Sequence, residues 1–245
     1  KQFREQPLNK QRLIDFLLNT SQRYIEARRI MQGLSLEQQN PSIPERLVAG
    51  MQAAALSPIH AVADRLVYQQ VREATGGQVK HWISGGGSLA KHLENFFEIV
   101  EVEILVGYGL TETSPVLTVR RPSRNLRFSS GQPLPGTAIR IVDLETRQPL
   151  PSGQRGLIMA RGPQIMQGYW QNPEATAKAI DPEGWFDTGD LGWVTLQSDL
   201  VVTGRAKDTI VLSNGENIEP QTIEDACLRS PYIHQIMLVG QDQKS

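Results

Sequence analysis

The chain has 245 residues, of which 39% are hydrophobic and 21% charged, and its formal net charge is -1. This composition is ordinary for a globular protein with a sizeable core, and so small a net charge gives no overall field that would attract nucleic acid or a membrane surface. The single cysteine, Cys227, excludes an intramolecular disulfide framework and a multi-cysteine zinc site. No apolar run reaches the roughly 18 residues of a transmembrane helix.

Residues 1–77 are predicted to be helical. Apolar side chains recur at spacings of four and seven, as at Leu13, Leu17 and Tyr24, which is typical of one apolar helix face. The stretch "NPSIP" should end this helix and open the next with Pro44 in its first turn. Pro58 is expected to interrupt the second helix, and the pair "GG" at residues 76–77 to end the helical block.

The pattern changes at Gln78. The stretches "VKHWIS", "LAKHLENFFEIV" and "VEILVGYG" predict a strand, a helix and a second strand over residues 78–118, which is a unit of a parallel sheet. Residues 119–206 hold short β segments separated by Gly, Pro and Asp, and predict a mixed or antiparallel subdomain. The fold class is therefore α/β, with a parallel core, flanking helices and a small β-rich subdomain.

The last third of the chain should add smaller elements. "NPEATAKAI" predicts a helix with Asn172 as its cap. After Asp208 we expect a strand, an Asn214–Gly215 turn, a helix from near Pro220 and a final strand "IHQIMLVG". Cys227 falls on that helix and is assigned to packing rather than to chemistry.

Three glycines, Gly85, Gly86 and Gly87, stand between the first predicted strand and the following helix in "ISGGGSLAK". Glycines let a ligand lie against the backbone, and a helix N-terminus offers free N–H groups to an anion. The stretch matches neither a P-loop nor a dinucleotide fingerprint, because Ala90 occupies a place that those motifs give to glycine. A tight turn without a ligand is the alternative.

"GYGLTETSP" follows the second predicted strand at the same edge of the sheet, where ligands of open α/β sheets bind. Tyr108 could stack on a base, the backbone of Gly109 could approach a ligand closely, and Thr111 could donate to a phosphate oxygen. Glu112 is a hard oxygen ligand that suits Mg²⁺ beside phosphates. The alternative is a solvated strand end.

Two aspartates, Asp187 and Asp190, flank a turn in "GWFDTGDLGWV". A carboxylate held in such a turn can accept both hydroxyls of a ribose through charge-assisted hydrogen bonds. We assign this role to Asp190 and expect Asp187 to cap its own turn. In "TGRAKD", Arg205 ends a predicted strand and precedes Lys207 and Asp208, which taken alone indicate a solvated surface.

The stretches "SGGGSL", "YGLTETSP", "GWFDTGD" and "GRAKDTIVLSNGENIEP" occur in this order, with "GQPLPG" and "GYWQNPEAT" between them. Together they resemble the motifs of the adenylate-forming superfamily, which includes acyl-CoA synthetases, adenylation domains of peptide synthetases and luciferases. The resemblance covers most of the chain from about Gln78 onward. The helical block followed by "LVYQQVREATGGQVKHWISGGGSL" is similar to the long-chain fatty-acid branch, and most of all to acyl–acyl-carrier-protein synthetases of the cyanobacterial type.

The resemblance implies a nucleotide site for ATP and AMP. The glycine triplet would line the site of the adenine and the acyl carboxylate, and Tyr108 would pack on the adenine. Thr111 would lie near the α-phosphate and Glu112 would bind Mg²⁺. Asp190 would hold the ribose hydroxyls, assisted by Arg205.

The resemblance also implies two domains and a two-step reaction. Lys207, with Asp208 beside it, would form the hinge between a large domain ending at residue 206 and the start of a small α+β domain in residues 207–245. A long-chain fatty carboxylate would attack Mg-ATP to give acyl-AMP and pyrophosphate. The thiol of coenzyme A, or of the phosphopantetheine on acyl carrier protein, would then displace AMP. The acceptor stays open, although the resemblance favours carrier protein.

Two motifs of the family lie outside this sequence: a phosphate-binding loop expected before Lys1 and a catalytic lysine expected after Ser245. We therefore expect an internal fragment that does not adenylate a fatty acid alone. The expected location is cytoplasmic, with peripheral contact to a membrane left open and no nucleic-acid partner. The alternatives are a non-catalytic nucleotide-binding module of the same fold, or a synthetase for a different carboxylic acid.

One cluster of like charge stands apart from these motifs. "VRRPSRNLR" contains four arginines and no acid, at Arg120, Arg121, Arg124 and Arg127. We interpret it as a solvated loop. An acidic carrier protein, the phosphates of coenzyme A or an anionic lipid is the alternative reason for such a cluster.

Overall fold

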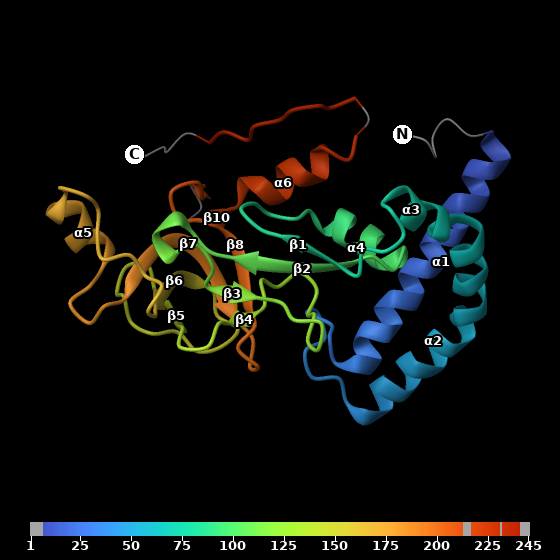
Figure 1. The fold of residues 1–245 in the computed structure, drawn as a ribbon, viewed down its shortest axis with the longest axis horizontal. Helices are drawn as coiled ribbons and strands as arrows, with labels where there is room; N and C mark the ends of the chain where they lie inside the picture. The colour runs from blue at the N-terminus through green and yellow to red at the C-terminus, as the bar shows by residue number, and fades with distance from the viewer. Residues whose placement is uncertain (1–6, 213–216, 231, 241–245) are drawn as a thin grey trace. The chain divides into compact units, whose positions relative to one another are not determined.

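The computed structural model describes residues 7–212, 217–230 and 232–240 (Figure 1). The chain forms two compact units, and each is described by itself. Unit one contains residues 1–106 and 120–128, and unit two contains residues 107–119 and 129–245.

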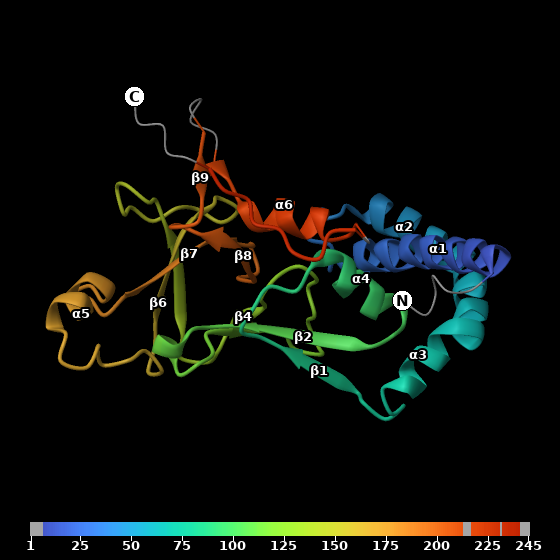
Figure 2. The same cartoon turned by 90° about the horizontal axis from the view of Figure 1, so that it is seen from above.

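The helices of unit one confirm the predicted helical block. They are α1 (Leu8–Gln32), α2 (Ile43–Ala63), a π-helical turn η1 (Asp64–Tyr68), α3 (Gln69–Ala74) and α4 (Lys91–Ile99). Helices α1 and α2 lie side by side as a hairpin (Figures 1 and 2). Helix α2 starts with a capping box, in which the backbone N–H of Ser42 donates to Glu45 Oε2 over 2.7 Å while Ser42 Oγ accepts from the Glu45 N–H.

The predicted break at Pro58 is wrong, because Pro58 lies inside the continuous helix α2. Proline deprives the carbonyl four residues earlier, at Ala54, of its usual donor. Both Ala54 and Pro58 are exposed, so water can satisfy that carbonyl and the helix continues. The helical block does end where the sequence predicts, since Gly76 and Gly77 both have a positive φ, at 94° and 69°.

A parallel strand pair comes after α3 in the chain and confirms the predicted strand–helix–strand unit. Strand β1 (His81–Ser84) pairs in parallel with β2 (Glu103–Tyr108), and α4 is the crossover between them. In this register Ser84 lies opposite Val106. Helices α1, η1 and α4 share an apolar core that includes Leu17, Ile25, Tyr68 and Ile99.

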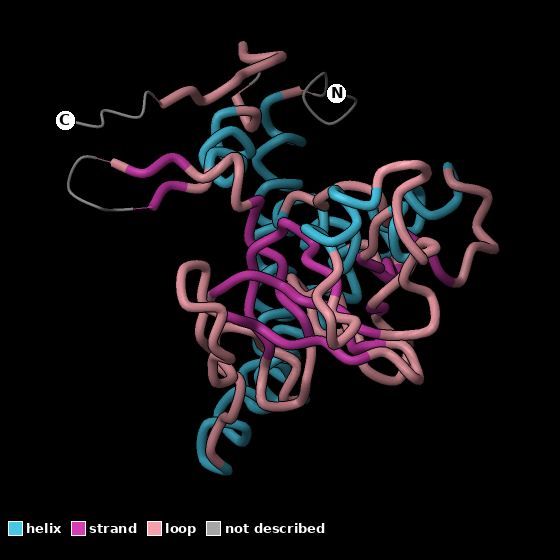
Figure 3. The backbone as a smooth tube through the Cα atoms, turned by 90° about the vertical axis from the view of Figure 1, so that its left-hand side faces the viewer, coloured by secondary structure: helices cyan, strands magenta, loops and turns pink. Residues whose placement is uncertain are grey.

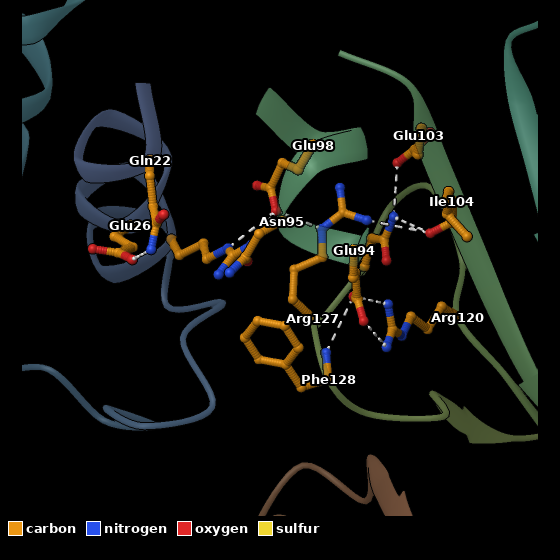
Figure 4. A network of polar contacts seen from close by, with 12 residues as sticks. Gln22, Glu26, Glu94, Asn95, Glu98, Glu103, Ile104, Arg120, Arg127 and Phe128 are labelled. Atoms are coloured by element: carbon orange, nitrogen blue, oxygen red, sulfur yellow. Dashed lines mark hydrogen bonds and ion pairs between the residues drawn. The ribbon is translucent and has the colours of Figure 1, made fainter. Parts of the chain in front are cut away.

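Residues 120–128 form a polar network with helices of unit one, which overturns the interpretation of a solvated arginine loop (Figure 4). Arg120 is 2% exposed and pairs with Glu94 of α4, and Arg127 is 9% exposed and lies 2.9 Å from Glu98. Glu98 Oε2 also forms an ion pair with the guanidinium of Arg29 on α1, at 2.5 Å. The balancing acids lie on another element, so the local sequence could not indicate them.

The sheet of unit two is antiparallel, as the sequence predicts for residues 119–206. Its strand order is β5 (Ala138–Val142), β6 (Gly156–Arg161), β7 (Phe186–Val194) and β8 (Leu200–Arg205). Strands are magenta in Figure 3. The end of β2 also pairs with β3 (Thr118–Val119), which pairs in turn with β4 (Gln132–Pro133). Ile141, Ile158 and Leu200 form a buried apolar cluster under this sheet.

The remaining elements of unit two agree with the sequence in part. Helix α5 (Pro173–Ala179) begins with the predicted cap, since the Asn172 side chain accepts from the Ala175 N–H over 3.0 Å. The short strands β9 (Ile210–Val211) and β10 (Asn217–Ile218) and helix α6 (Pro220–Cys227) follow. The predicted Asn214–Gly215 turn lies outside the described residues. Within the described residues, every helix is too short or too polar to cross a membrane.

The predicted final strand "IHQIMLVG" is wrong. Its described residues have no strand structure, and Met237 and Val239 are each 77% exposed. A β-favouring sequence becomes a strand only where a neighbouring strand supplies hydrogen bonds and a packing surface. The described part of the chain supplies neither at this position.

Candidate functional site

Two side chains from separate segments of unit two contact the carboxylate of Asp190. The hydroxyl of Tyr108, at the end of β2, donates to Asp190 Oδ2 over 2.7 Å. Arg205 Nε lies 3.2 Å from the other oxygen, Oδ1. Asp190 and Arg205 are direct partners in the register of β7 and β8. The predicted association of Asp190 with Arg205 is therefore present, and Tyr108 joins it through its hydroxyl.

Burial governs the electrostatics of this cluster. Asp190 is 5% exposed, and this burial raises the pKa of its carboxyl, opposed by the hydrogen bond from Tyr108 and by the charge of Arg205. Burial, followed by the charge of Asp190, raises the pKa of Tyr108. Tyr108 is therefore a neutral hydrogen-bond donor at physiological pH, and its ring packs against the cluster of Ile141, Ile158 and Leu200.

The loop after β2 is shaped by its own packing. A Cβ atom at Gly109 would overlap the carbonyl oxygen of Pro115, so the fold itself requires glycine there. The loop then forms the short 3₁₀ turn η2 (Thr111–Thr113), in which Thr113 Oγ1 accepts from the Leu110 N–H over 2.9 Å. Close approach of a ligand to Gly109 and the phosphate contact of Thr111 stay predictions.

Glu112 lies on this turn and is held by a tyrosine that the sequence did not single out. The hydroxyl of Tyr169 donates to Glu112 Oε1 over 2.9 Å, and the backbone N–H of Met166 donates to the Glu112 carbonyl over 2.8 Å. Partial desolvation, together with the hydrogen bond and the charge of Glu112, raises the pKa of Tyr169. The only sequence signal was the "GYWQNPEAT" motif that contains this tyrosine.

The donor set suits Mg²⁺ better than a cation bound wholly by protein. Among residues 7–212, 217–230 and 232–240, no group of three or more His, Cys, Asp or Glu side chains could hold a metal ion. Mg²⁺ commonly uses one or two carboxylates, substrate phosphates and several waters. The single carboxylate of Glu112 fits that pattern.

The first aspartate of the "FDTGD" turn, Asp187, has the structural role that we expected. Asp187 Oδ1 accepts from the Gly189 N–H over 2.9 Å, which is an Asx turn, and its other oxygen pairs with Arg147 at 2.7 Å. Lys207 and Asp208 are exposed in the turn after β8, where the Asp208 N–H donates to the Arg205 carbonyl over 3.1 Å. Their role as a hinge stays a prediction.

The glycine triplet lies in unit one, in the loop that follows β1. Gly86 has a φ of 80°, which favours glycine. A Cβ at Gly86 or Gly87 would meet nothing within 4 Å, so protein packing does not demand the absence of a side chain there. The predicted role of Gly85, Gly86 and Gly87 in lining an adenine and carboxylate site stays a prediction.

Comparison with known families decides the classification. The family described as AMP-binding enzyme matches residues 32–170, and the AMP-binding enzyme C-terminal domain matches residues 207–245. The chain belongs to the AMP-binding enzyme family. The resemblance drawn from its motifs is thereby confirmed.

Two of three curated relatives of this AMP-binding protein are named as long-chain fatty-acid ligases. It is 45% identical over 244 residues to a probable acyl-activating enzyme 16, chloroplastic, of Arabidopsis thaliana. This alignment covers 93% of this chain and 34% of the relative. It is 44% identical to a chloroplastic long-chain-fatty-acid–[acyl-carrier-protein] ligase of the same plant, over 93% of this chain and 33% of the relative. A long-chain-fatty-acid–CoA ligase of Mycobacterium tuberculosis is 38% identical over 181 residues, with 74% and 28% covered.

Solved structures share the fold. ATP-bound MatB from Rhodopseudomonas palustris matches with a TM-score of 0.59 and 32% identity, over 64% of this chain and 31% of that one. The o-succinylbenzoate CoA synthetase of Bacillus subtilis, in complex with its acyl-adenylate intermediate, matches with a TM-score of 0.62 and 26% identity, over 72% and 37%. The chain thus spans about a third of the length of the relatives that it matches.

Proposed function

We propose that this chain is part of an ATP-dependent ligase that activates a long-chain fatty acid as its acyl adenylate and then transfers the acyl group to a thiol. The observation that carries the proposal is the buried carboxylate of Asp190, held by Tyr108 and Arg205. The fatty-acid ligase names of the relatives support the substrate class.

Asp190 has the capacity to bind the ribose of a nucleotide. An ionised carboxylate has about four acceptor positions, and Tyr108 and Arg205 occupy one on each oxygen. As far as residues 7–212, 217–230 and 232–240 are concerned, two positions are left for the two ribose hydroxyls. Because both oxygens are already oriented, little side-chain entropy is lost when the sugar binds.

The phosphate side of the site would use the η2 turn. Thr111 would donate its hydroxyl to the α-phosphate, and Glu112 would hold Mg²⁺ through its carboxylate. When bound, Mg²⁺ would neutralise the charge of the phosphates at the reacting centre. The ring of Tyr108 would pack on the adenine. The glycine triplet begins directly after Ser84, at the carboxyl end of β1, and would leave room for the acyl carboxylate.

The second step would need a rearrangement of the small domain. The two family matches leave residues 171–206 between them, and the second match begins at Lys207. This boundary supports a hinge at Lys207 and Asp208, at which rotation would exchange one catalytic face for another.

The acceptor of the acyl group would be coenzyme A or the phosphopantetheine of acyl carrier protein. The acyl-carrier-protein ligase is 44% identical over 93% of the chain, whereas the CoA ligase is 38% identical over 74%. This difference favours carrier protein. A cytoplasmic location, with or without peripheral membrane contact, completes the proposal.

ATP–pyrophosphate exchange in the complete natural protein, with fatty acids of graded length, tests the proposal. Asp190→Ala should weaken nucleotide binding by about 10- to 100-fold, the equivalent of one charge-assisted hydrogen bond of roughly 1.5–3 kcal/mol. Asp187→Asn is the matched control, because asparagine preserves the Asx turn. Exchange that survives Asp190→Ala at the parent's nucleotide affinity would exclude this role. Nucleotide binding without any exchange would instead favour a non-catalytic module.

A further inference from the structure

The motif "GYWQNPEAT" has no role in the proposed function, yet the structure gives its tyrosine a specific contact. Tyr169 Oη donates to Glu112 Oε1 over 2.9 Å, from a residue 57 positions later in the chain. The backbone of the same segment is joined to the same turn, because the Met166 N–H donates to the Glu112 carbonyl over 2.8 Å. One residue of η2 is thus held by both its side chain and its main chain.

The rest of the motif orients Tyr169. Its backbone N–H donates to Thr176 Oγ1 over 2.9 Å, and that hydroxyl donates in turn to the Asn172 carbonyl over 2.9 Å. Asn172 is the cap of α5, so the first turn of this helix supports the tyrosine backbone. Gly168 has a φ of 153°, and a Cβ there would lie 2.7 Å from Thr176 Cγ2, so any side chain would displace the threonine. The residues of the pattern G-Y-x-x-N-x-x-x-T therefore contact one another and together orient the Tyr169 side chain.

We infer that Tyr169 is a positioning residue, which fixes the Glu112 carboxylate so that its second oxygen is presented to the divalent cation of a bound nucleotide. This inference rests on the proposed function, in which Glu112 is the Mg²⁺ ligand. It adds a residue from a distant segment to the metal-binding machinery and assigns a purpose to the motif.

The chemistry of the contact fits that role. The phenol is neutral, so it orients the carboxylate and leaves intact the negative charge that attracts the cation. A lysine or arginine in its place would cancel that charge. It occupies Oε1, and in the described part of the chain no hydrogen bond is made to Oε2. Residues that orient metal ligands in this way typically change metal affinity by about 10- to 100-fold when they are removed.

The experiment measures binding rather than turnover in the complete natural protein. The affinity for α,β-methylene-ATP is determined by calorimetry over a series of Mg²⁺ concentrations, and the affinity for AMP is determined in EDTA. Tyr169→Phe should raise the Mg²⁺ concentration for half-maximal tightening of the ATP analogue about tenfold, and should leave AMP binding unchanged. Thr176→Val should shift the Mg²⁺ requirement in the same direction by less. Tyr232→Phe is the matched control, because Tyr232 is 91% exposed.

Glu112→Gln separates failure of this inference from failure of the proposed function. If Glu112→Gln raises the Mg²⁺ requirement and Tyr169→Phe does not, the positioning role of Tyr169 is wrong and the metal role of Glu112 stands. If neither change affects the Mg²⁺ requirement, the proposed metal role itself is wrong. A loss of AMP affinity in EDTA by Tyr169→Phe would show a merely structural contact and would also overturn the inference.

Discussion

Tyr108 and Asp190 are joined by a hydrogen bond of 2.7 Å between the phenol hydroxyl and Oδ2, across 82 positions of the chain. The same tyrosine packs its ring against the apolar cluster under the sheet of unit two. Tyr108 thus connects core packing to the proposed ribose-binding carboxylate, and perturbing it should be measurable in both stability and binding.

The raised pKa of Asp190 predicts opposite effects of acid on binding and on stability. Ribose binding needs the ionised carboxylate, so AMP affinity should fall as the pH drops through the folded-state pKa, which lies above the ordinary aspartate value of about 3.9. A raised folded-state pKa contributes stability that is fully present below the unfolded-state pKa and is lost as pH rises through the folded-state pKa. Calorimetry of AMP binding and thermal melts of the complete protein across this pH range test the two effects. Asp190→Asn should abolish the contribution of this carboxyl to the pH dependence of both AMP affinity and stability.

Tyr108→Phe should move that binding midpoint to higher pH. The hydrogen bond from Tyr108 lowers the pKa of Asp190, so its removal leaves burial less opposed. The variant should also lose about 1 kcal/mol of unfolding free energy, the typical net value of a hydrogen bond. AMP titrations at several pH values measure the midpoint, and a midpoint equal to the parent's would refute the coupling between the two residues.

Two glycines should respond differently to alanine. Gly109→Ala should destabilise the protein strongly, because the new methyl group would overlap the Pro115 carbonyl. Gly87→Ala should leave the thermal midpoint unchanged, since nothing lies within 4 Å of the added Cβ. If a ligand lies against this backbone, as proposed, Gly87→Ala should still weaken binding of the acyl adenylate by roughly 10- to 100-fold, as one misplaced methyl group does in a tight site. Binding equal to the parent's would remove Gly87 from the site.

The buried pair of Arg120 and Glu94 should be costly to break from one side. Glu94→Gln removes the carboxylate that pairs with the buried Arg120 guanidinium, which should cost about 3–5 kcal/mol in urea denaturation. Arg121→Gln is the control, because Arg121 is exposed and its replacement should change stability by less than about 0.5 kcal/mol. A small effect of Glu94→Gln would mean that the pair is solvated.

This pair also restricts how a docking role for the arginine segment can be tested. Charge reversal at Arg120 or Arg127 would destabilise unit one whatever the partner, because both side chains are buried against α4. Of the four arginines, only Arg121 is exposed. A test of carrier-protein docking therefore belongs at that position.

Local patterns predicted the elements with local causes. The helix α1, the helix end at Gly76 and Gly77, and the cap at Asn172 depend on neighbours within a few residues, and the structure confirms them. Pro58 failed as a helix breaker because solvent exposure, which one sequence does not reveal, can satisfy the freed carbonyl. The strand predicted near Met237 failed because strands need partners, and pairing is not a local property.

By itself, the sequence determined the fold class, the family and the residue types of the candidate site, because these are written in short motifs whose order along the chain can be read directly. Only the tertiary structure decided that Tyr108 reaches Asp190, that Tyr169 reaches Glu112, and that the acids opposite Arg120 and Arg127 come from α4. The physical reason is distance along the chain: each of these contacts joins side chains that no repeat or spacing relates, and each exists only because strand register, turns and helix caps bring separate segments together.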